Sequence, residues 1–593
     1  AETRYFRRVF AINRPVPNPI DEARLDITAD NAYTVWVNGV EVGKGDDWQT
    51  VKHFDVKELL VDGKNVVAVE ARNTEGPAGL MVRLGYTPNG QSKLALCSDG
   101  SWKASKTAGK DWQKREFDDK AWQPVKELGP YGKTAPWNQI AAAGNPRFTV
   151  PDGFRVEMAA KNPDPNDVFS LVNMTFDDRG RLLVSQENGP VLLCTDPDKD
   201  GVLQNVRSYC SIVKNCQGMC WVGDALLLVG QGPDGAGLYR CRDTKGKDEI
   251  DEAKLLFPYA KVKVPGYGEH GGMGEHGPHA ILHGPDGFLY VVNGNHSWAD
   301  VKRLASNSPL RRWPHGQMGP DQGQPGSTED VLLPRLNDAN GHAVNLLAPG
   351  GCIWRLDPDG TNPALVACGF RNEFDAAFSL NGELFTFDSD MEWDEGLPWY
   401  RPVRVCHCPP GADFVWRTGS ANTPPWYIDS LPAIYDVGRG SPVGLEFYEH
   451  TAFPPKYRGA YLMADWSLGI IYAAHLKPAG ASYTLDLEKF CTGAPMNVTD
   501  IGVAPNGAVY FTMGGRHTQG GVYRIVYDGG DKKTAAEKSD LDTLLSWPQP
   551  QDAWSRAALA KWVKEKKIDL VRVLGAGAED STRPVADLSL ITH

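Results

Sequence analysis

Histidine and carboxylate side chains crowd into one glycine-rich segment of this 593-residue chain. Residues 269–279 hold three imidazoles and two carboxylates, and His283 and His296 follow. Imidazole titrates near neutral pH and ligates metal ions, so the segment can supply a general base or a metal cradle. A single histidine would more often be a packed core residue, and His283 precedes a turn that it can cap. The density of the group nevertheless favours a chemical role.

Two acidic runs have the composition of cation sites. The first has carboxylates at alternate positions followed by a glycine for a sharp turn, as Ca²⁺ requires, at Asp196, Asp198 and Asp200. Arg207 stands where an EF-hand loop would place its bidentate glutamate, so an ordinary solvated loop is the alternative. The second run holds four carboxylates that repel one another unless a cation, Arg401 or Arg404 compensates: Asp388, Asp390, Glu392 and Asp394. Calcium is the predicted ion, because hard oxygen ligands dominate.

A repeated hairpin pattern must position these groups. An apolar run, a turn and a second apolar run recur six times between residues 165 and 527. Asn-Gly and Asp-Gly turns between β-rich runs mark hairpins, and hairpins at roughly forty-residue or longer spacing mark propeller blades. The pattern predicts a six-bladed β-propeller, an all-β fold that gathers loops from every blade around one axial pocket.

Alignment of the repeats on their turn glycines (180, 287, 382 and 507) brings polar residues to equivalent positions. His276 and Arg371 lie eleven residues before the glycine, and Asp375 and Asp500 lie seven before it. These positions enter the innermost strand of each blade, so we expect one polar cluster at one mouth of the channel. Its other predicted members are His279, Asn372, Glu373 and Thr499. The alternative is that these side chains tie neighbouring blades together through buried hydrogen bonds.

The chain on either side of the repeats reads differently. Residues 1–146 alternate apolar and polar positions like half-buried strands and predict a separate β-domain. Residues 531–593 start with charged sequence that carries apolar residues at helical spacing, broken at Pro548 and Pro550, and predict a short helical extension. The propeller is therefore assigned to residues 147–530.

Composition and charge narrow the function. The chain has 41% hydrophobic and 23% charged residues, which is ordinary for a globular protein. Its formal net charge of −12 and its lack of a long basic run argue against nucleic acid and anionic membranes as partners. It contains no apolar stretch of about 18 residues, so no membrane-spanning segment is predicted.

Eleven cysteines are many for a cytosolic protein. Several crowd between residues 194 and 241, where disulfides are expected, and a secreted or periplasmic location follows. The odd count leaves at least one thiol over. The opening Ala1-Glu2-Thr3 is compatible with the end left by a signal peptidase. The rival is a metal site at Cys216 and Cys220 or at Cys406-His407-Cys408, but neither has a paired zinc-ribbon spacing.

Over residues 150–527, several motifs resemble the propeller of the large secreted dehydrogenase-like proteins of planctomycetes and verrucomicrobia. Three of them are Glu275-His276-Gly277-Pro278-His279, Gly369-Phe370-Arg371-Asn372-Glu373-Phe374-Asp375 and Gly514-Gly515-Arg516-His517-Thr518-Gln519. That group is similar in turn to the soluble glucose and sorbosone dehydrogenases, which are quinoproteins on a six-bladed propeller. Residues 1–146 resemble the galactose-binding-like jelly roll found beside the catalytic domains of rhamnosidases. The two resemblances imply a β-sandwich next to a sugar-acting propeller.

In those dehydrogenases a channel histidine deprotonates the sugar hydroxyl while hydride passes to pyrroloquinoline quinone (PQQ), and an Arg-Asn pair contacts cofactor and substrate. The resemblance implies that His276 is the base and that Arg371 and Asn372 are the pair. Asp465 and Asp500 occupy the fifth and sixth blades, where the quinoproteins hold the cofactor's carboxylates with basic residues, so PQQ would meet acid there. The chain has no Cys-x-x-Cys-His motif and therefore no c-type haem.

The sequence favours an exported sugar- or polyol-acting oxidoreductase-like propeller, served by an electron-acceptor protein. Its predicted catalytic residues are His276, Arg371 and Asn372, and its predicted substrate-binding residues are His279, Glu373, Asp375, Asp500 and Arg516. Calcium is the preferred cofactor and PQQ the second choice. One alternative is a non-catalytic glycan-binding or cell-surface protein. The other is a metal-dependent carbohydrate lyase or hydrolase that uses the histidine segment as ligands.

Overall fold

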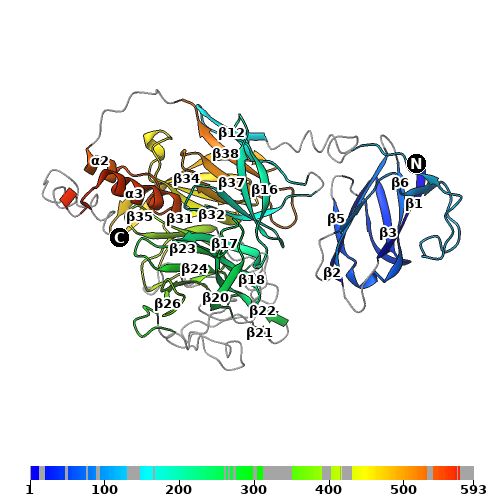
Figure 1. The fold of residues 1–593 in the computed structure, drawn as a ribbon, viewed down its shortest axis with the longest axis horizontal. Coiled ribbons are helices and arrows are strands. Elements are labelled where there is room, and N and C mark those ends of the chain that lie inside the picture. Colours follow the sequence, from blue (N-terminus) through cyan, green and yellow to red (C-terminus); the bar gives the residue numbers. More distant parts are fainter. Residues whose placement is uncertain are drawn as a thin grey trace. The chain divides into compact units, whose positions relative to one another are not determined.

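The computed structural model divides the chain into two compact units, Ala1–Pro146 and Arg147–His593. The residues that it describes are 2–12, 20–46, 48, 51–74, 78–88, 94–129, 147–164, 167–259, 262–264, 268–270, 276–297, 304–310, 350–389, 402–414, 416, 431–529, 539–570 and 572–573. Strands make up nearly all of the regular structure in both units (Figure 1).

The first unit consists of two antiparallel sheets around one apolar core, as predicted. Their strand orders are β10-β9-β1-β6-β3-β4 and β5-β2-β7-β8. The strands are β1 (Glu2–Ile12), β2 (Ile20–Asp30), β3 (Ala32–Val37), β4 (Val40–Gly45), β5 (Lys52–Asp55), β6 (Gly63–Asn73), β7 (Gly79–Pro88), β8 (Leu94–Cys97), β9 (Lys103–Ser105) and β10 (Gln123–Pro124). Alternation in β3 buries Tyr33, Val35 and Val37, because successive side chains of a strand point to opposite faces.

The second unit contains six four-stranded antiparallel blades, which confirms the predicted propeller. Blade 1 is β13 (Leu171–Phe176), β14 (Leu182–Gln186), β15 (Val191–Pro197) and β16 (Leu203–Cys210); blade 2 is β17 (Lys214–Val222), β18 (Ala225–Gly232), β19 (Gly235–Arg242) and β20 (Glu252–Pro258); blade 3 is β23 (Pro278–His283), β24 (Leu289–Asn293), β25 (Gly351–Leu356) and β26 (Ala364–Phe370). Blade 4 is β27 (Glu373–Phe378), β28 (Leu384–Asp388), β29 (Val403–His407) and β31 (Tyr435–Gly438); blade 5 is β32 (Pro442–Tyr448), β33 (Ala460–Asp465), β34 (Ile470–Ala479) and β35 (Ser482–Ala494); blade 6 is β36 (Val498–Val503), β37 (Val509–Met513), β38 (Gly521–Tyr527) and β12 (Phe154–Ala160).

The first strand of each blade lies innermost, and the six inner strands close a ring. Each contacts the next, from β13 through β17, β23, β27, β32 and β36 back to β13. The ring is locked because β12, which comes before blade 1 in the sequence, pairs with β38 and completes blade 6. Short strands extend the sheets or pair on their own: β11 (Arg147–Thr149), β30 (Ala412–Asp413), and β21 (Val262–Val264) with β22 (Gly268–His270).

The hairpin turns that follow the inner strands lie on one side of the ring. Gly180, Gly287, Gly382 and Gly507 all have positive φ, from 75° to 81°, which glycine adopts readily. Turns of neighbouring blades touch, since a Cβ atom on Gly180 would lie 2.5 Å from Pro505. The last residues of the inner strands therefore surround one opening of the channel, the turn mouth. Their first residues surround the opposite opening, the entrance mouth.

Two short helices end the described chain, as predicted. Ser539 caps α2 (Asp540–Leu545) by accepting a hydrogen bond from the Asp542 amide. After a break that contains Pro548 and Pro550, the chain continues as α3 (Ala553–Lys566). Helix α3 packs against the propeller core through Trp554, and Trp547, which follows α2, lies 5.7 Å from the Trp562 ring of α3 (Figure 1). No described helix is long and apolar enough to cross a membrane.

The predicted disulfides are wrong, because all eleven cysteines are free thiols. Nine of them, all except Cys97 and Cys220, are buried. Buried thiols pack as small apolar core residues, which explains the cysteine content without an oxidising environment. The secreted or periplasmic location therefore loses its support from cysteine usage.

Candidate functional site

His276 lies at the entrance mouth, directly before β23, and is only 4% exposed. Its Nδ1 lies 2.7 Å from Oδ1 of Asn295, and its ring lies 4.7 Å from the His296 ring. Because an amide oxygen only accepts hydrogen bonds, this contact assigns the ring proton to Nδ1 and makes Nε2 the basic nitrogen. The His276 segment is thus arranged to present a base.

Arg371 and Asn372 lie next to it, directly before β27. The Asn295 amide donates to the Arg371 carbonyl over 3.0 Å, so the two segments are joined. Asn372 Oδ1 lies 2.8 Å from His279 Nε2, and the His279 ring packs 4.4 Å from the Phe374 ring. A Cβ atom on the nearby Gly294 would lie 2.3 Å from Asn372 Oδ1. The structure therefore brings four of the predicted site residues together: His276, His279, Arg371 and Asn372.

Asp388 clamps the Arg371–Asn372 backbone, which differs from its predicted role as a calcium ligand. The fully buried carboxylate accepts hydrogen bonds from the amides of Arg371 (3.1 Å) and Asn372 (3.0 Å). Its other oxygen accepts from Nε and Nη2 of Arg404 at 3.1 and 2.9 Å. Burial raises the pKa of Asp388 and Arg404 opposes that shift. With both oxygens engaged, Asp388 holds the site rather than a metal ion. Asp390, Glu392 and Asp394 lie outside the described residues.

The run at Asp196, Asp198 and Asp200 forms a hairpin turn in which the first two carboxylates are engaged within the loop. Asp198 Oδ1 accepts from the backbone amides of Asp200 and residue 202, and Asp196 Oδ2 accepts from Asn205. The Arg524 guanidinium donates to the carbonyls of residues 200 and 201, so a cation already occupies that side of the loop. Across the described ranges, no three His, Cys, Asp or Glu side chains form a group that could hold a metal ion.

Asp375 and Asp500 connect neighbouring blades by hydrogen bonds. The sequence analysis gave this structural role as the alternative to a ligand-binding role. Asp375 Oδ2 accepts from the Leu445 amide of blade 5 at 2.8 Å. Asp500 Oδ2 accepts from the Met174 amide of blade 1 at 2.7 Å and from Asn173 Nδ2 at 2.6 Å. Burial raises the pKa of Asp375 to about 7 and raises that of Asp500 as well. Both carboxyls are therefore engaged in the ring rather than presented to a ligand.

Glu373 is enclosed and Arg516 is exposed. Neither carboxyl oxygen of Glu373 has a hydrogen-bond partner among the described residues, and a Cβ atom on Gly351 would lie 2.2 Å from Oε2. Burial, and secondarily the Asp388 charge, raise the pKa of Glu373 well above its usual value, which favours its protonated form. Arg516 instead stacks 5.4 Å over the Trp466 ring at the entrance mouth. Arg516 can reach a ligand and Glu373 cannot.

The described entrance mouth does not fit PQQ, which carries three carboxylates. Arg371 is the positive side chain within the His276 cluster, Arg516 and Lys214 (the first residue of β17) belong to other blades, and Arg404 is neutralised by Asp388. Asp465 is fully buried there with Oδ2 unpartnered among the described residues, and burial raises its pKa. A tricarboxylate needs several arginine or lysine donors, and these residues add acid instead.

Sequence reasoning missed one residue of the site, Asn295. Arg404 was one of the two arginines named as compensating the acidic run, and it lies on β29 paired with Asp388. Asn295 follows β24 in a polar turn, and nothing in its type or spacing links it to His276. The pairing of Asn295 with His276 follows only from the approach of two loops.

Comparisons with known proteins show partial similarities. Residues 142–326 match a family described as a domain of unknown function, DUF7133. An alpha-L-rhamnosidase of Streptomyces avermitilis is 34% identical over 165 residues, which is 26% of this chain and 15% of that protein. The chain thus spans only a small part of the length of that curated relative. The similarity assigns no activity to the whole chain.

Two solved structures show the same coverage of the chain. One is the PQQ-bound form of an aldose sugar dehydrogenase from Streptomyces coelicolor, at 14% identity and a TM-score of 0.42 over 64% of this chain and 99% of that one. The other is the PQQ domain of a pyranose dehydrogenase from Coprinopsis cinerea in its holo form, at 10% identity and a TM-score of 0.42 over 64% and 97%. At these identities and TM-scores, neither similarity assigns an activity to this chain.

Proposed function

We propose that the propeller is an exported oxidoreductase that acts on a sugar or polyol at the entrance mouth. The main observation behind this proposal is a cluster of four side chains. Asn295 holds the His276 ring so that Nε2 is its basic nitrogen, and Arg371 and Asn372 lie beside it. The sequence motifs of these segments support the assignment. A quarter of the chain is similar to a protein named as a rhamnosidase, which supports a carbohydrate-related role for the protein as a whole rather than for the propeller in particular.

In the proposed reaction, His276 Nε2 takes the proton of a substrate hydroxyl group. The Arg371 guanidinium and the Asn372 amide donate hydrogen bonds that orient the oxygen. The C–H bond on the same carbon breaks, and its hydride leaves to a two-electron acceptor, so a carbonyl group forms. Because the described residues do not fit PQQ, no step is routed through it; a diffusible quinone-class acceptor takes the hydride, and an electron-acceptor protein re-oxidises the quinol.

A carbohydrate-binding protein without catalysis is the second candidate. It is favoured by the use of three channel carboxylates, Asp375, Asp388 and Asp500, in hydrogen bonds that hold the blades and loops. A metal-dependent lyase or hydrolase has less support, since the described part of the chain offers no three-ligand metal group.

A dye-linked assay with a panel of aldoses and polyols tests the proposal, run with and without added PQQ and calcium. Replacement of His276 by Ala is expected to lower turnover by about 10²–10⁴-fold, the usual loss on removal of a general base. His475→Ala is the matched control, because His475 lies on the outer strand β34 and pairs with Glu488 at 3.2 Å. If the His276→Ala variant keeps its turnover, His276 is not the general base. Sugar binding by calorimetry without turnover under any condition would favour the second candidate.

A further inference from the structure

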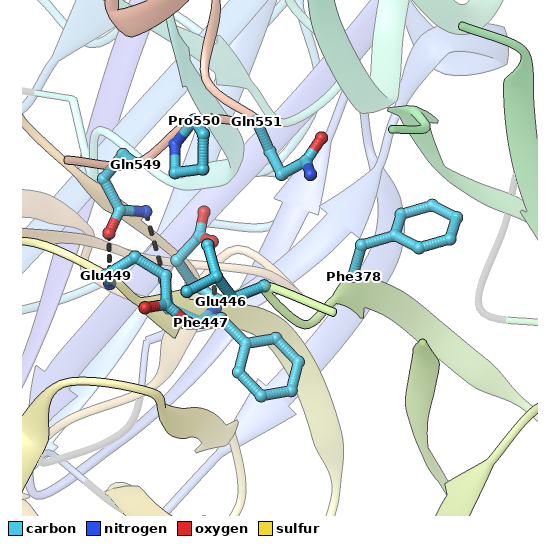
Figure 2. A pocket seen from close by; sticks show the side chains of 8 residues that line it. Phe378, Glu446, Phe447, Glu449, Gln549, Pro550 and Gln551 are labelled. Carbon is cyan, nitrogen blue, oxygen red and sulfur yellow. Dashed lines mark hydrogen bonds between the residues drawn. The ribbon is translucent and has the colours of Figure 1, made fainter. Parts of the chain in front are cut away.

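The C-terminal segment 547–556 lies across the turn mouth and bonds to the last residues of several inner strands. Gln549 Nε2 donates a hydrogen bond to the Phe447 carbonyl at the end of β32 (3.0 Å). Gln549 Oε1 accepts a hydrogen bond from the backbone amide of Glu449 (Figure 2). Trp554 Nε1 donates to the Val503 carbonyl at the end of β36 (3.1 Å). Arg556 Nη1 lies 2.7 Å from His283 Nδ1 at the end of β23. We refer to residues 547–556 as the plug segment.

The plug segment is closely seated. Gln549 and Trp554 are 2% and 6% exposed. In Figure 2, Gln549, Pro550 and Gln551 face Glu446 and Glu449 across a cavity of about 10 Å³, which has room for about one water molecule. The inner-strand ends of blades 3, 5 and 6 all bond to this one segment, which therefore covers part of the turn mouth.

Acidic side chains meet where the plug segment docks. Glu446 of β32 faces Asp552 of the plug segment and also the carboxyls of Asp375 and Asp500. Burial, with repulsion from these three groups, raises the pKa of Glu446 well above its usual value. Burial also raises the pKa of Asp552 and that of Glu449 to about 7. The docked segment therefore holds protons that the same groups would release in water.

The remaining charged groups of the interface do not neutralise these acids. Burial lowers the pKa of Arg556, and the electrostatic effects of Cys220 and Asp552 partly oppose that shift. Burial and Arg556 lower the pKa of His283 to about 4, and burial lowers the pKa of His450. The two imidazoles are thus neutral at neutral pH. One guanidinium faces several carboxyls, which the interface accommodates by keeping acids protonated.

We propose that the plug segment is a proton-dependent closure, which covers part of the turn mouth while Glu446, Glu449 and Asp552 carry protons and loosens when they ionise. For acids whose pKa is raised on docking, the stabilisation is complete below the ordinary value of about 4 and is lost as pH rises through about 7. His283 and His450 act in the opposite sense, because lowered imidazole pKa values weaken docking as pH falls below about 6.5. Three carboxyls outnumber two imidazoles, so docking is strongest in mild acid.

Hydrogen exchange of the full chain at pH 6 and pH 8.5, corrected for intrinsic rates, tests the closure. Peptides that cover 547–556 are expected to lose protection at least about tenfold at the higher pH, which corresponds to one shifted pKa unit. Peptides from β24, the second strand of blade 3, serve as the internal reference. Glu446→Gln with Glu449→Gln is expected to reduce the pH dependence to the share that Asp552 contributes, whereas Glu488→Gln, a change on the outer strand β35, is expected to retain it in full.

Equal protection of 547–556 at both pH values would overturn the closure, as would a Glu446→Gln, Glu449→Gln variant with the wild-type pH dependence. If that variant does not fold, Asp552→Asn gives the same test, because asparagine also serves at a helix N-cap. The readout is exchange and not turnover. A failure of the proposed oxidation at the entrance mouth therefore leaves this test unaffected.

Discussion

Asp388 offers the sharpest test of how the entrance mouth is built. The change Asp388→Asn keeps the shape of the side chain and removes its charge. In the wild type, the fully buried carboxylate faces the Arg404 guanidinium, whose side chain is 9% exposed, and accepts the amides of Arg371 and Asn372. The variant leaves the guanidinium buried without its counter-ion, and it replaces an acceptor for two amides by a group that also carries donors.

The expected loss of stability is large. Removal of one partner of a buried ion pair costs about 3–5 kcal/mol, because the other charge stays desolvated. At about 2 °C per kcal/mol for a unit of this size, the melting temperature of the larger unit is expected to fall by roughly 6–10 °C. Asp486→Asn is the control. Asp486 and its partner Lys477 are 68% and 59% exposed, so its loss is expected to shift the transition by no more than about 1 °C.

Differential scanning calorimetry of the full chain measures both variants. Arg404→Met added to Asp388→Asn is expected to recover part of the loss, with a coupling energy of about 1–3 kcal/mol, since the orphaned charge is then gone. If Asp388→Asn melts at the wild-type temperature, Asp388 does not stabilise the site through Arg404 and the two backbone amides. A calcium-dependent rise in the wild type that this substitution abolishes would return Asp388 to the role of a metal ligand.

Two further expectations concern the cysteines and the first unit. Thiol titration of natively sourced protein in denaturant, without reductant, is expected to give eleven reactive thiols, and a count of nine or fewer would reinstate a disulfide. A fragment of residues 1–146 is expected to melt cooperatively, because both of its sheets and its apolar core are closed within that unit. A disordered fragment would show that the rest of the chain completes its core.

The architecture could be predicted because its signals are local. A hairpin needs a turn that glycine permits and two strands that alternate or run apolar, and all of these lie within about twenty residues of sequence. The turn glycines that mark these hairpins in the sequence have positive φ values in the structure: Gly180, Gly287, Gly382 and Gly507. The helical extension likewise followed from spacing and from two prolines. The equivalence of His276 with Arg371 came from the same repeat, because each precedes an inner strand.

The use of each polar side chain was decided only by the tertiary structure. Asp375, Asp388 and Asp500 have side chains of the type that bind cations, yet their carboxyls accept hydrogen bonds from backbone amides of other segments, which no local pattern encodes. Asn295 meets His276, and Gln549 meets β32 from a hundred residues away, for the same reason. Sequence determines which groups are available and where the chain turns. The approach of distant segments in a desolvated ring decides which partner each buried group must find, because an unpaired one is costly there.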